Sequence, residues 1–148
     1  MSTDESVTKD LLETLEDGKD GFAKGAEKLN DLGVADHAAA FQQFAQQRTQ
    51  FADELQGMAN SYGDDPDRSG SIAATLHRGW MSLKDALTKD TPTSIFEVAA
   101  QGEDHAVKEY EKARDTDISA DLRTVVQRQL TEVRTVRDTV TSLAASAE

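Results

Sequence analysis

The chain has 148 residues, with 28 acidic and 16 basic side chains, three histidines and no cysteine, and its formal net charge is -12. Nucleic acid and anionic membrane surfaces are excluded as expected partners, because both bind clustered basic side chains. The lack of cysteine excludes disulfides, thiolate metal sites and cysteine nucleophiles. Without an apolar window of about 20 residues or an apolar leader near the N-terminus, we expect a cytoplasmic protein.

A chain of this length is expected to form one domain, over residues 1–148. Helical periodicity predicts a first helix over about 6–32, ended by Gly33, and a second over about 36–62. The short connection between them indicates an antiparallel hairpin.

A turn-rich stretch, 63–70, follows the first hairpin. Apolar spacing then predicts a short helix over about 71–88, which carries the single tryptophan, Trp80. Together these residues form a connection too long for a simple turn, as in a bundle whose two hairpins are joined by a crossover.

The last two helices are predicted over about 92–115 and 119–146. Thr91 and Pro92 are typical of a helix start, and Ser119 is a good N-cap for the final helix. The whole pattern predicts an all-α protein, a four-helix bundle with a short extra helix in the long crossover between two antiparallel hairpins.

Polar or small residues interrupt the apolar stripes of all four long helices near mid-length, at Gly18, Arg48, Gly102 and Gln129. Gly18 and Arg48 lie equally far from the turn at Gly33, so a rise of about 1.5 Å per residue places them at similar depth. Similar spacing around the second turn brings Gly102 and Gln129 to the same level. We therefore predict one central polar layer.

Several segments resemble a bacterial family of ferritin-like four-helix-bundle proteins that is classed among the domains of unknown function. The segments that carry the resemblance are Arg48-x-x-Phe51-x-x-Glu54-Leu55, Leu76-His77-Arg78-Gly79-Trp80 and Gly102-Glu103-Asp104. The resemblance implies a ferritin-like fold and no particular activity. One departure is Arg137-Asp138, at a place where a His-Asp pair is expected.

A ferritin-like di-iron centre needs a Glu from each of two helices and a Glu-x-x-His motif from each of the other two. Here Glu54 is followed three residues later by Gly57, and Glu132 by Thr135. We therefore expect no metal and no other cofactor. If a poorer carboxylate site did form, its candidate ligands would be Glu54, Glu103, His105 and Glu132.

The preferred interpretation of the layer is a buried polar network of Arg48, Glu54, Glu103 and Gln129. The guanidinium of Arg48 can pair with the carboxylate of Glu103 or of Glu54, and Gln129 would take a remaining donor. Gly18 and Gly102 are expected to leave room for the large Arg48 side chain. Such a network would set the helix register rather than perform chemistry.

Two further features could bind a small ligand. His77, Arg78 and Trp80 place a cation beside an aromatic ring, which suits an anionic or planar ligand. The glycine ridge of Gly18, Gly21 and Gly25 could form a groove, although close contact with the crossover under Trp80 is the simpler interpretation.

The function expected from these features is that of a non-enzymatic structural or binding protein. One alternative is an iron-binding or iron-oxidising ferritin-like protein, and a second is a carrier of a small ligand. A homodimer is compatible with the pattern, but the sequence marks no interface and identifies neither a protein partner nor a ligand.

Overall fold

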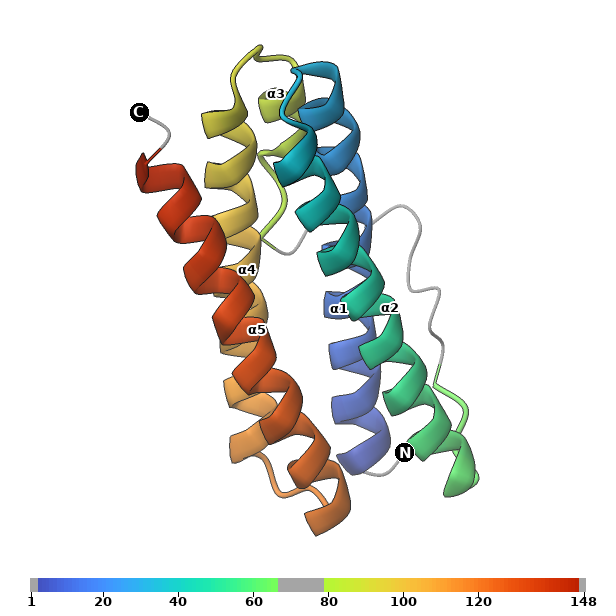
Figure 1. Cartoon of the computed structure of the whole chain (residues 1–148). Helices are drawn as coiled ribbons and strands as arrows, with labels where there is room; N and C mark the ends of the chain where they lie inside the picture. The colour runs from blue at the N-terminus through green and yellow to red at the C-terminus, as the bar shows by residue number, and fades with distance from the viewer. Residues whose placement is uncertain (1–2, 67–78, 147–148) are drawn as a thin grey trace.

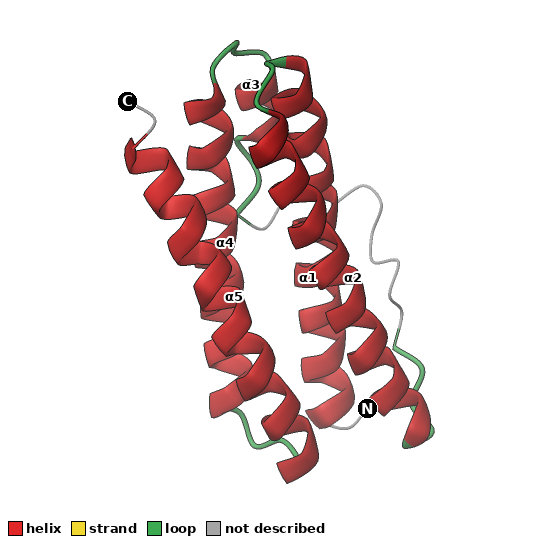
Figure 2. Cartoon of the chain, viewed as in Figure 1, coloured by secondary structure: helices red, strands yellow, loops and turns green. Residues whose placement is uncertain are grey.

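The computed structural model describes residues 3–66 and 79–146, and its regular structure in these ranges is entirely α-helical (Figure 2). The helices are α1 (Thr3–Asp31), α2 (Ala35–Ser61), α3 (Leu83–Leu87), α4 (Pro92–Asp115) and α5 (Ala120–Ser146). Four are long and run lengthwise through the molecule, while α3 is a single short turn near one end (Figure 1). The all-α prediction is confirmed. None of the described helices is long and apolar enough to cross a membrane.

The four long helices begin and end within three residues of their predicted bounds. The helix predicted over 71–88 is wrong in its described part, because residues 79–82 form turns and only Leu83–Leu87 is helical. Residues 71–78 lie outside the described residues. The physical reason for the turn is Gly79, whose φ of 82° belongs to the left-handed region and cannot continue an α-helix.

Gly33 ends α1 in the manner predicted from its position. Its φ is 80°, and its N–H donates to the carbonyl of Asn30 at 3.0 Å. The next N–H, that of Val34, donates to the carbonyl of Leu29, also at 3.0 Å. This pair of bonds is a Schellman motif, which satisfies carbonyls that the helix itself leaves open.

Gly33→Ala is expected to lower the free energy of unfolding by about 1 kcal/mol, because an L-residue is strained in the left-handed conformation. Gly57→Ala is the matched control, since Gly57 lies inside α2 and a Cβ there would have no described atom within 4 Å. That change should stabilise by about 0.5–1 kcal/mol, through the lower backbone entropy of alanine in the unfolded chain. Urea unfolding of both variants checks the opposite signs, and equal effects would contradict the left-handed turn.

The starts of the last two helices also follow the sequence. Ser119 Oγ accepts a hydrogen bond from the N–H of Leu122 at 3.3 Å, which makes Ser119 the N-cap of α5. Thr91 precedes α4 in extended conformation, and Pro92 occupies its first turn, where no intrahelical N–H bond is lost.

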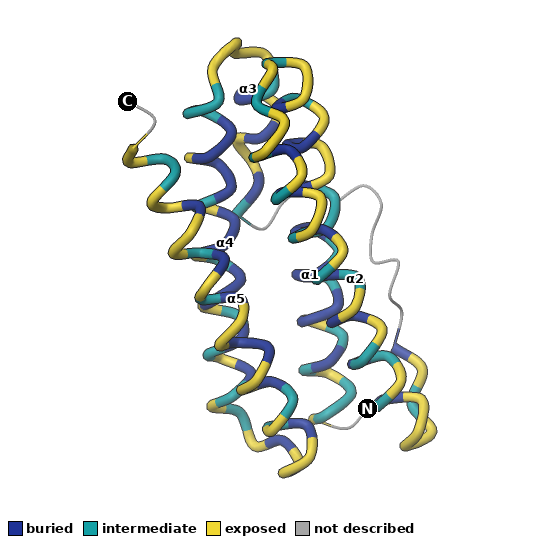
Figure 3. The backbone as a smooth tube through the Cα atoms, in the orientation of Figure 1, coloured by how far each residue is buried: buried dark blue, intermediate teal, exposed yellow. Residues whose placement is uncertain are grey.

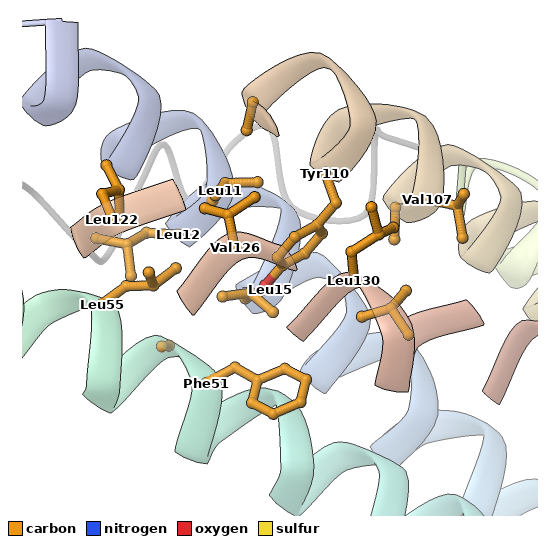
Figure 4. Packing of buried hydrophobic residues seen from close by; sticks show 14 of the residues in the cluster. Leu11, Leu12, Leu15, Phe51, Leu55, Val107, Tyr110, Leu122, Val126 and Leu130 are labelled. Atoms are coloured by element: carbon orange, nitrogen blue, oxygen red, sulfur yellow. The ribbon is translucent and has the colours of Figure 1, made fainter. Parts of the chain in front are cut away.

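The packing joins α1 closely to α2, α4 closely to α5, and the two hairpins mainly through α1 and α4, whereas α2 and α5 approach each other only sparsely. The buried positions face inward along all four long helices (Figure 3). They form two hydrophobic clusters, one towards each end of the molecule. Figure 4 shows part of the first cluster, around Leu15, Phe51 and Tyr110.

The boundary between the clusters falls at mid-helix. On α1 it lies between Leu15 and Phe22, and on α2 between Ala45 and Phe51. The residues at the boundary include Arg48, which is 1% exposed, and Glu103, which is fully buried. The central polar layer therefore separates two apolar clusters.

Candidate functional site

The centre of the layer is an ion pair between α2 and α4. Arg48 Nη1 donates to Glu103 Oε1 and Arg48 Nη2 donates to Glu103 Oε2, each at 2.6 Å. This is the parallel two-bond geometry in which a guanidinium matches a carboxylate. Because α2 belongs to the first hairpin and α4 to the second, the pair links the two halves of the molecule across the core.

The rest of the Arg48 side chain is also accommodated. Its Nε donates to Gln47 Oε1 at 3.2 Å, and its Cζ lies 5.4 Å from the centre of the Phe22 ring, in cation–π range. Gly18 faces the Arg48 side chain as predicted, but a Cβ there would lie 3.4 Å from Arg48 Nη1, an ordinary van der Waals contact, so Arg48 does not require a glycine at this position.

The charge of Arg48 is secure despite its burial. Burial by itself would lower the pKa of the guanidinium, but the opposite charge and the hydrogen bonds of Glu103 outweigh it and raise that pKa. Arg48 is therefore a permanent positive charge inside the protein, and the Glu103 carboxylate neutralises it.

A second polar network lies beside the first and reaches the surface. The hydroxyl of Tyr110 donates to Gln129 Oε1 at 2.7 Å, and Gln129 Nε2 donates to Glu54 Oε1 at 2.9 Å and to the Phe51 carbonyl at 3.4 Å. Arg128 Nη2 donates to the other Glu54 oxygen. That bond from Arg128 is the main reason why the pKa of Glu54 is lowered.

The structure decides one alternative that the sequence left open and corrects one prediction. Of the two carboxylates considered for Arg48, the structure selects Glu103, and Glu54 turns to Arg128 and Gln129 instead. Gln129 was predicted to accept a hydrogen bond from Arg48. Instead, the Gln129 side-chain oxygen accepts from the hydroxyl of Tyr110. The two networks share the middle of the molecule without forming one continuous cluster among the described residues.

Tyr110 is the network member that sequence reasoning missed. No polar role was assigned to it from the sequence. Its side chain is fully buried, among Leu15, Val126 and Leu130 (Figure 4). A buried tyrosine hydroxyl needs a hydrogen-bond partner, so its place on an apolar stripe was the available signal. Burial also raises the pKa of Tyr110, which keeps the phenol neutral.

Tyr110→Phe is expected to lower the free energy of unfolding by about 1–3 kcal/mol, because the buried Gln129 oxygen loses its donor. Tyr62→Phe is the control, since Tyr62 is 56% exposed and its hydroxyl bonds to Asp121 at the surface. Denaturant unfolding measures both. Equal losses would show that burial of the Tyr110 bond has no energetic consequence.

The four candidate metal ligands do not converge. Both oxygens of Glu103 are engaged by Arg48, and Glu54 is engaged by Gln129 and Arg128. Glu132 is half exposed and lies 4.0 Å from Arg128. His105 is partly buried at the turn of Gly79. Across residues 3–66 and 79–146, no group of three or more His, Asp or Glu side chains could hold a metal ion.

Trp80 occupies a slot between α1 and α4. A Cβ on Gly21 would lie 2.4 Å from the indole, and one on Gly102 would lie 2.3 Å from it, distances that no real Cβ adopts. Only the two glycines allow the ring to enter. The indole also meets the Phe22 ring edge-on, with centroids 5.1 Å apart.

This placement corrects two expectations. The predicted ligand surface of His77, Arg78 and Trp80 is wrong for Trp80, which is 2% exposed, while His77 and Arg78 lie outside the described residues. Gly102 makes room for Trp80 rather than for Arg48. The simpler interpretation of the glycine ridge holds at Gly21, which lies under the indole.

The comparisons with known proteins give a family. Residues 5–116 match the model of the family described as Domain of unknown function (DUF2383). The chain belongs to this family. The matched range includes Arg48, Glu103 and Trp80 and ends between α4 and α5, so Gln129 lies beyond it. No curated protein and no solved structure matches the chain.

Proposed function

We propose that this protein is a non-enzymatic, ferritin-like four-helix bundle in which the Arg48–Glu103 pair stands where a ferritin-like protein would hold its metals. Its role is structural or that of a binding scaffold, with the ion pair holding the two hairpins in one relative register. The proposal includes a bacterial source and a cytoplasmic location, as expected from the sequence and the resemblance. Cell fractionation of the source organism would test the cytoplasmic location.

The observation that carries the proposal is the complete use of the Glu103 carboxylate by Arg48, with two bonds of 2.6 Å in a buried layer. A carboxylate engaged in this way has no oxygen free for a cation, and the guanidinium beside it would repel one. Glu103 is a poor candidate for a nucleophile or a base, because Arg48 neutralises its charge, engages both of its oxygens and lies with it in the buried layer.

A register function follows from where the two partners lie. The hairpins meet closely only along α1 and α4, and the ion pair supplies a further link from α2 to α4. A sliding of one hairpin by a helical turn would leave both charges buried and unpaired, at a cost of several kcal/mol. The pair thus disfavours shifted arrangements that the apolar clusters alone would tolerate.

Anaerobic Fe(II) binding and metal content of the untagged protein test the proposal. We compare wild type with Glu103→Ala and with Glu132→Ala, which removes an exposed carboxylate from the alternative ligand set. The expected result is no stoichiometric iron in any of the three proteins and a lower melting temperature in Glu103→Ala alone. About two metals per chain in wild type, lost in Glu103→Ala, would overturn the proposal in favour of an iron-binding protein.

A further inference from the structure

One face of the molecule lacks the charge that dominates the rest of it. Between residues 38 and 52 of α2 the only charged side chain is Arg48, which is buried. The exposed positions of this stretch are alanine and glutamine: Ala39, Gln42, Gln43, Gln46 and Gln50. Exposed positions recur along α2 from one turn to the next (Figure 3). We call this surface the neutral face.

The end of α5 packs on the same hydrophobic cluster as this part of α2 and also lacks charged side chains. Residues 139–146 contain no charged side chain, and Val136 and Val140 share a hydrophobic cluster with Phe41 and Ala45 of α2. The first half of α2 and the last half of α5 run in opposite directions at the same end of the molecule (Figure 1). Partly buried Phe44 and Leu143 pack on the same cluster and add apolar surface.

Helices α1 and α4 present like charge to any acidic partner, whereas α5 carries three acidic and four basic side chains. α1 carries nine acidic and four basic side chains, and α4 carries six acidic and three basic ones. In a chain with net charge -12, two copies that met through α1 or α4 would repel each other. Two copies that meet through residues 39–50 of α2 bring no charged side chain of that stretch together, and the exposed carboxylates of Asp36 and Asp53 flank it.

The spacing on α2 suits a second copy in particular. Ala39, Gln43, Gln46 and Gln50 follow one another at intervals of four, three and four residues and so form one stripe along the helix. An amide side chain is both donor and acceptor, so a glutamine stripe is complementary to itself across a two-fold axis. Alanine allows the two helices to approach closely.

We propose that this protein forms a homodimer through the neutral face, with α2 of one copy antiparallel to α2 of the other. The proposal is independent of the proposed function, because no residue of the polar layer takes part. The contact spans about three helical turns, or about 16 Å, so the dimer is small in area and reversible. The contact is opposed by the long-range repulsion between two acidic molecules and by the repulsion between Asp36 of one copy and Asp53 of the other, at the two ends of the stripe.

Sedimentation equilibrium over a range of protein concentrations tests the dimer. Wild type is expected to show a monomer–dimer equilibrium that tightens as salt rises from about 0.1 M to 1 M, since the Debye length falls from about 10 Å to about 3 Å. A molecule that stays monomeric at every concentration and salt level would overturn the proposal.

Charge variants locate the interface. Gln43→Glu with Gln46→Glu should weaken the dimer about tenfold or more, because carboxylates then face each other across the axis. The matched control, Gln101→Glu with Gln127→Glu, changes the net charge equally at exposed positions of α4 and α5 and should keep the wild-type affinity. Equal weakening by both pairs would place the contact elsewhere and overturn the assignment.

Mixing gives the positive test. The double variant with Gln43→Lys and Gln46→Lys should also be monomeric by itself. A mixture of this lysine variant and the glutamate variant should form a heterodimer whose affinity falls as salt rises. Failure of the mixture to associate while wild type dimerises would contradict the antiparallel α2 contact.

Discussion

Arg48→Ala is expected to lower the free energy of unfolding by about 3–5 kcal/mol, because it leaves the buried Glu103 carboxylate without the guanidinium that binds both of its oxygens. Arg128→Ala is the matched control. Arg128 also pairs with a glutamate, Glu54, but its side chain is half exposed, and a pair of this kind contributes about 1 kcal/mol or less. Urea unfolding of the three proteins measures the difference.

A loss below about 1 kcal/mol for Arg48→Ala would show that the pair is hydrated and would remove the basis of the register function. A second variant separates the ion pair from the space it fills. Arg48→Met combined with Glu103→Met replaces both charges by apolar side chains and should recover most of the loss, since an apolar core of similar volume avoids the desolvation of two ions. If the two hairpins of the double variant pack against each other in more than one register, the resonances in its NMR spectrum should broaden.

Trp80→Ala is expected to lower the free energy of unfolding by about 3–5 kcal/mol, because it empties the slot between α1 and α4. The glycines that line the slot have no side chains with which to close it. Met81→Ala is the control: Met81 is the adjacent residue and is 76% exposed, so its truncation should change stability by about 0.5 kcal/mol or less.

Circular dichroism follows the urea unfolding of Met81→Ala and of Trp80→Ala, which has no tryptophan. In wild type, Trp80 provides a second readout. It is the only tryptophan in the chain, so native fluorescence reports the slot alone. Emission in wild type should be that of a buried indole and should shift to longer wavelength only at global unfolding. Native emission at the wavelength of a solvent-exposed indole would contradict the burial of Trp80 in the slot. A loss of stability in Trp80→Ala no larger than that in Met81→Ala would contradict it as well.

A chain of contacts connects the two sites. The indole of Trp80 meets Phe22, and Phe22 lies under the guanidinium of Arg48. Loss of Trp80 should therefore admit water towards the ion pair and weaken it. This coupling predicts that Trp80→Ala and Arg48→Ala destabilise by less together than the sum of their separate effects.

Several elements of the fold could be predicted from the sequence because their causes are local. Gly33 ends α1 through its own left-handed backbone, and Ser119 caps α5 through an N–H three residues away. The inward position of Arg48 followed from its place in a heptad-like stripe. Helix geometry alone also disfavours Glu54 as the partner of Arg48. Glu54 follows Arg48 by six residues, and at 3.6 residues per turn it points well away from the face that carries Arg48.

The crossover shows where this reasoning fails. Apolar spacing predicted a continuous helix through residues 79–82, but a left-handed turn at Gly79 directs Trp80 between two glycines on other helices. The favourable contact of the indole with α1 and α4 outweighs the helical preference of a short segment. Gly102 was misassigned for the same reason, since its neighbour in space comes from a segment whose path was unknown.

By itself the sequence determined the four long helices, their ends and the depth of the polar layer, because periodicity and capping act over a few residues. Only the tertiary structure decided which polar groups meet. Arg48 lies 55 residues from Glu103, and Gln129 lies 75 residues from Glu54. Such pairs depend on the rotation and separation of helices packed against each other, and several carboxylates at similar depth satisfy the same linear pattern.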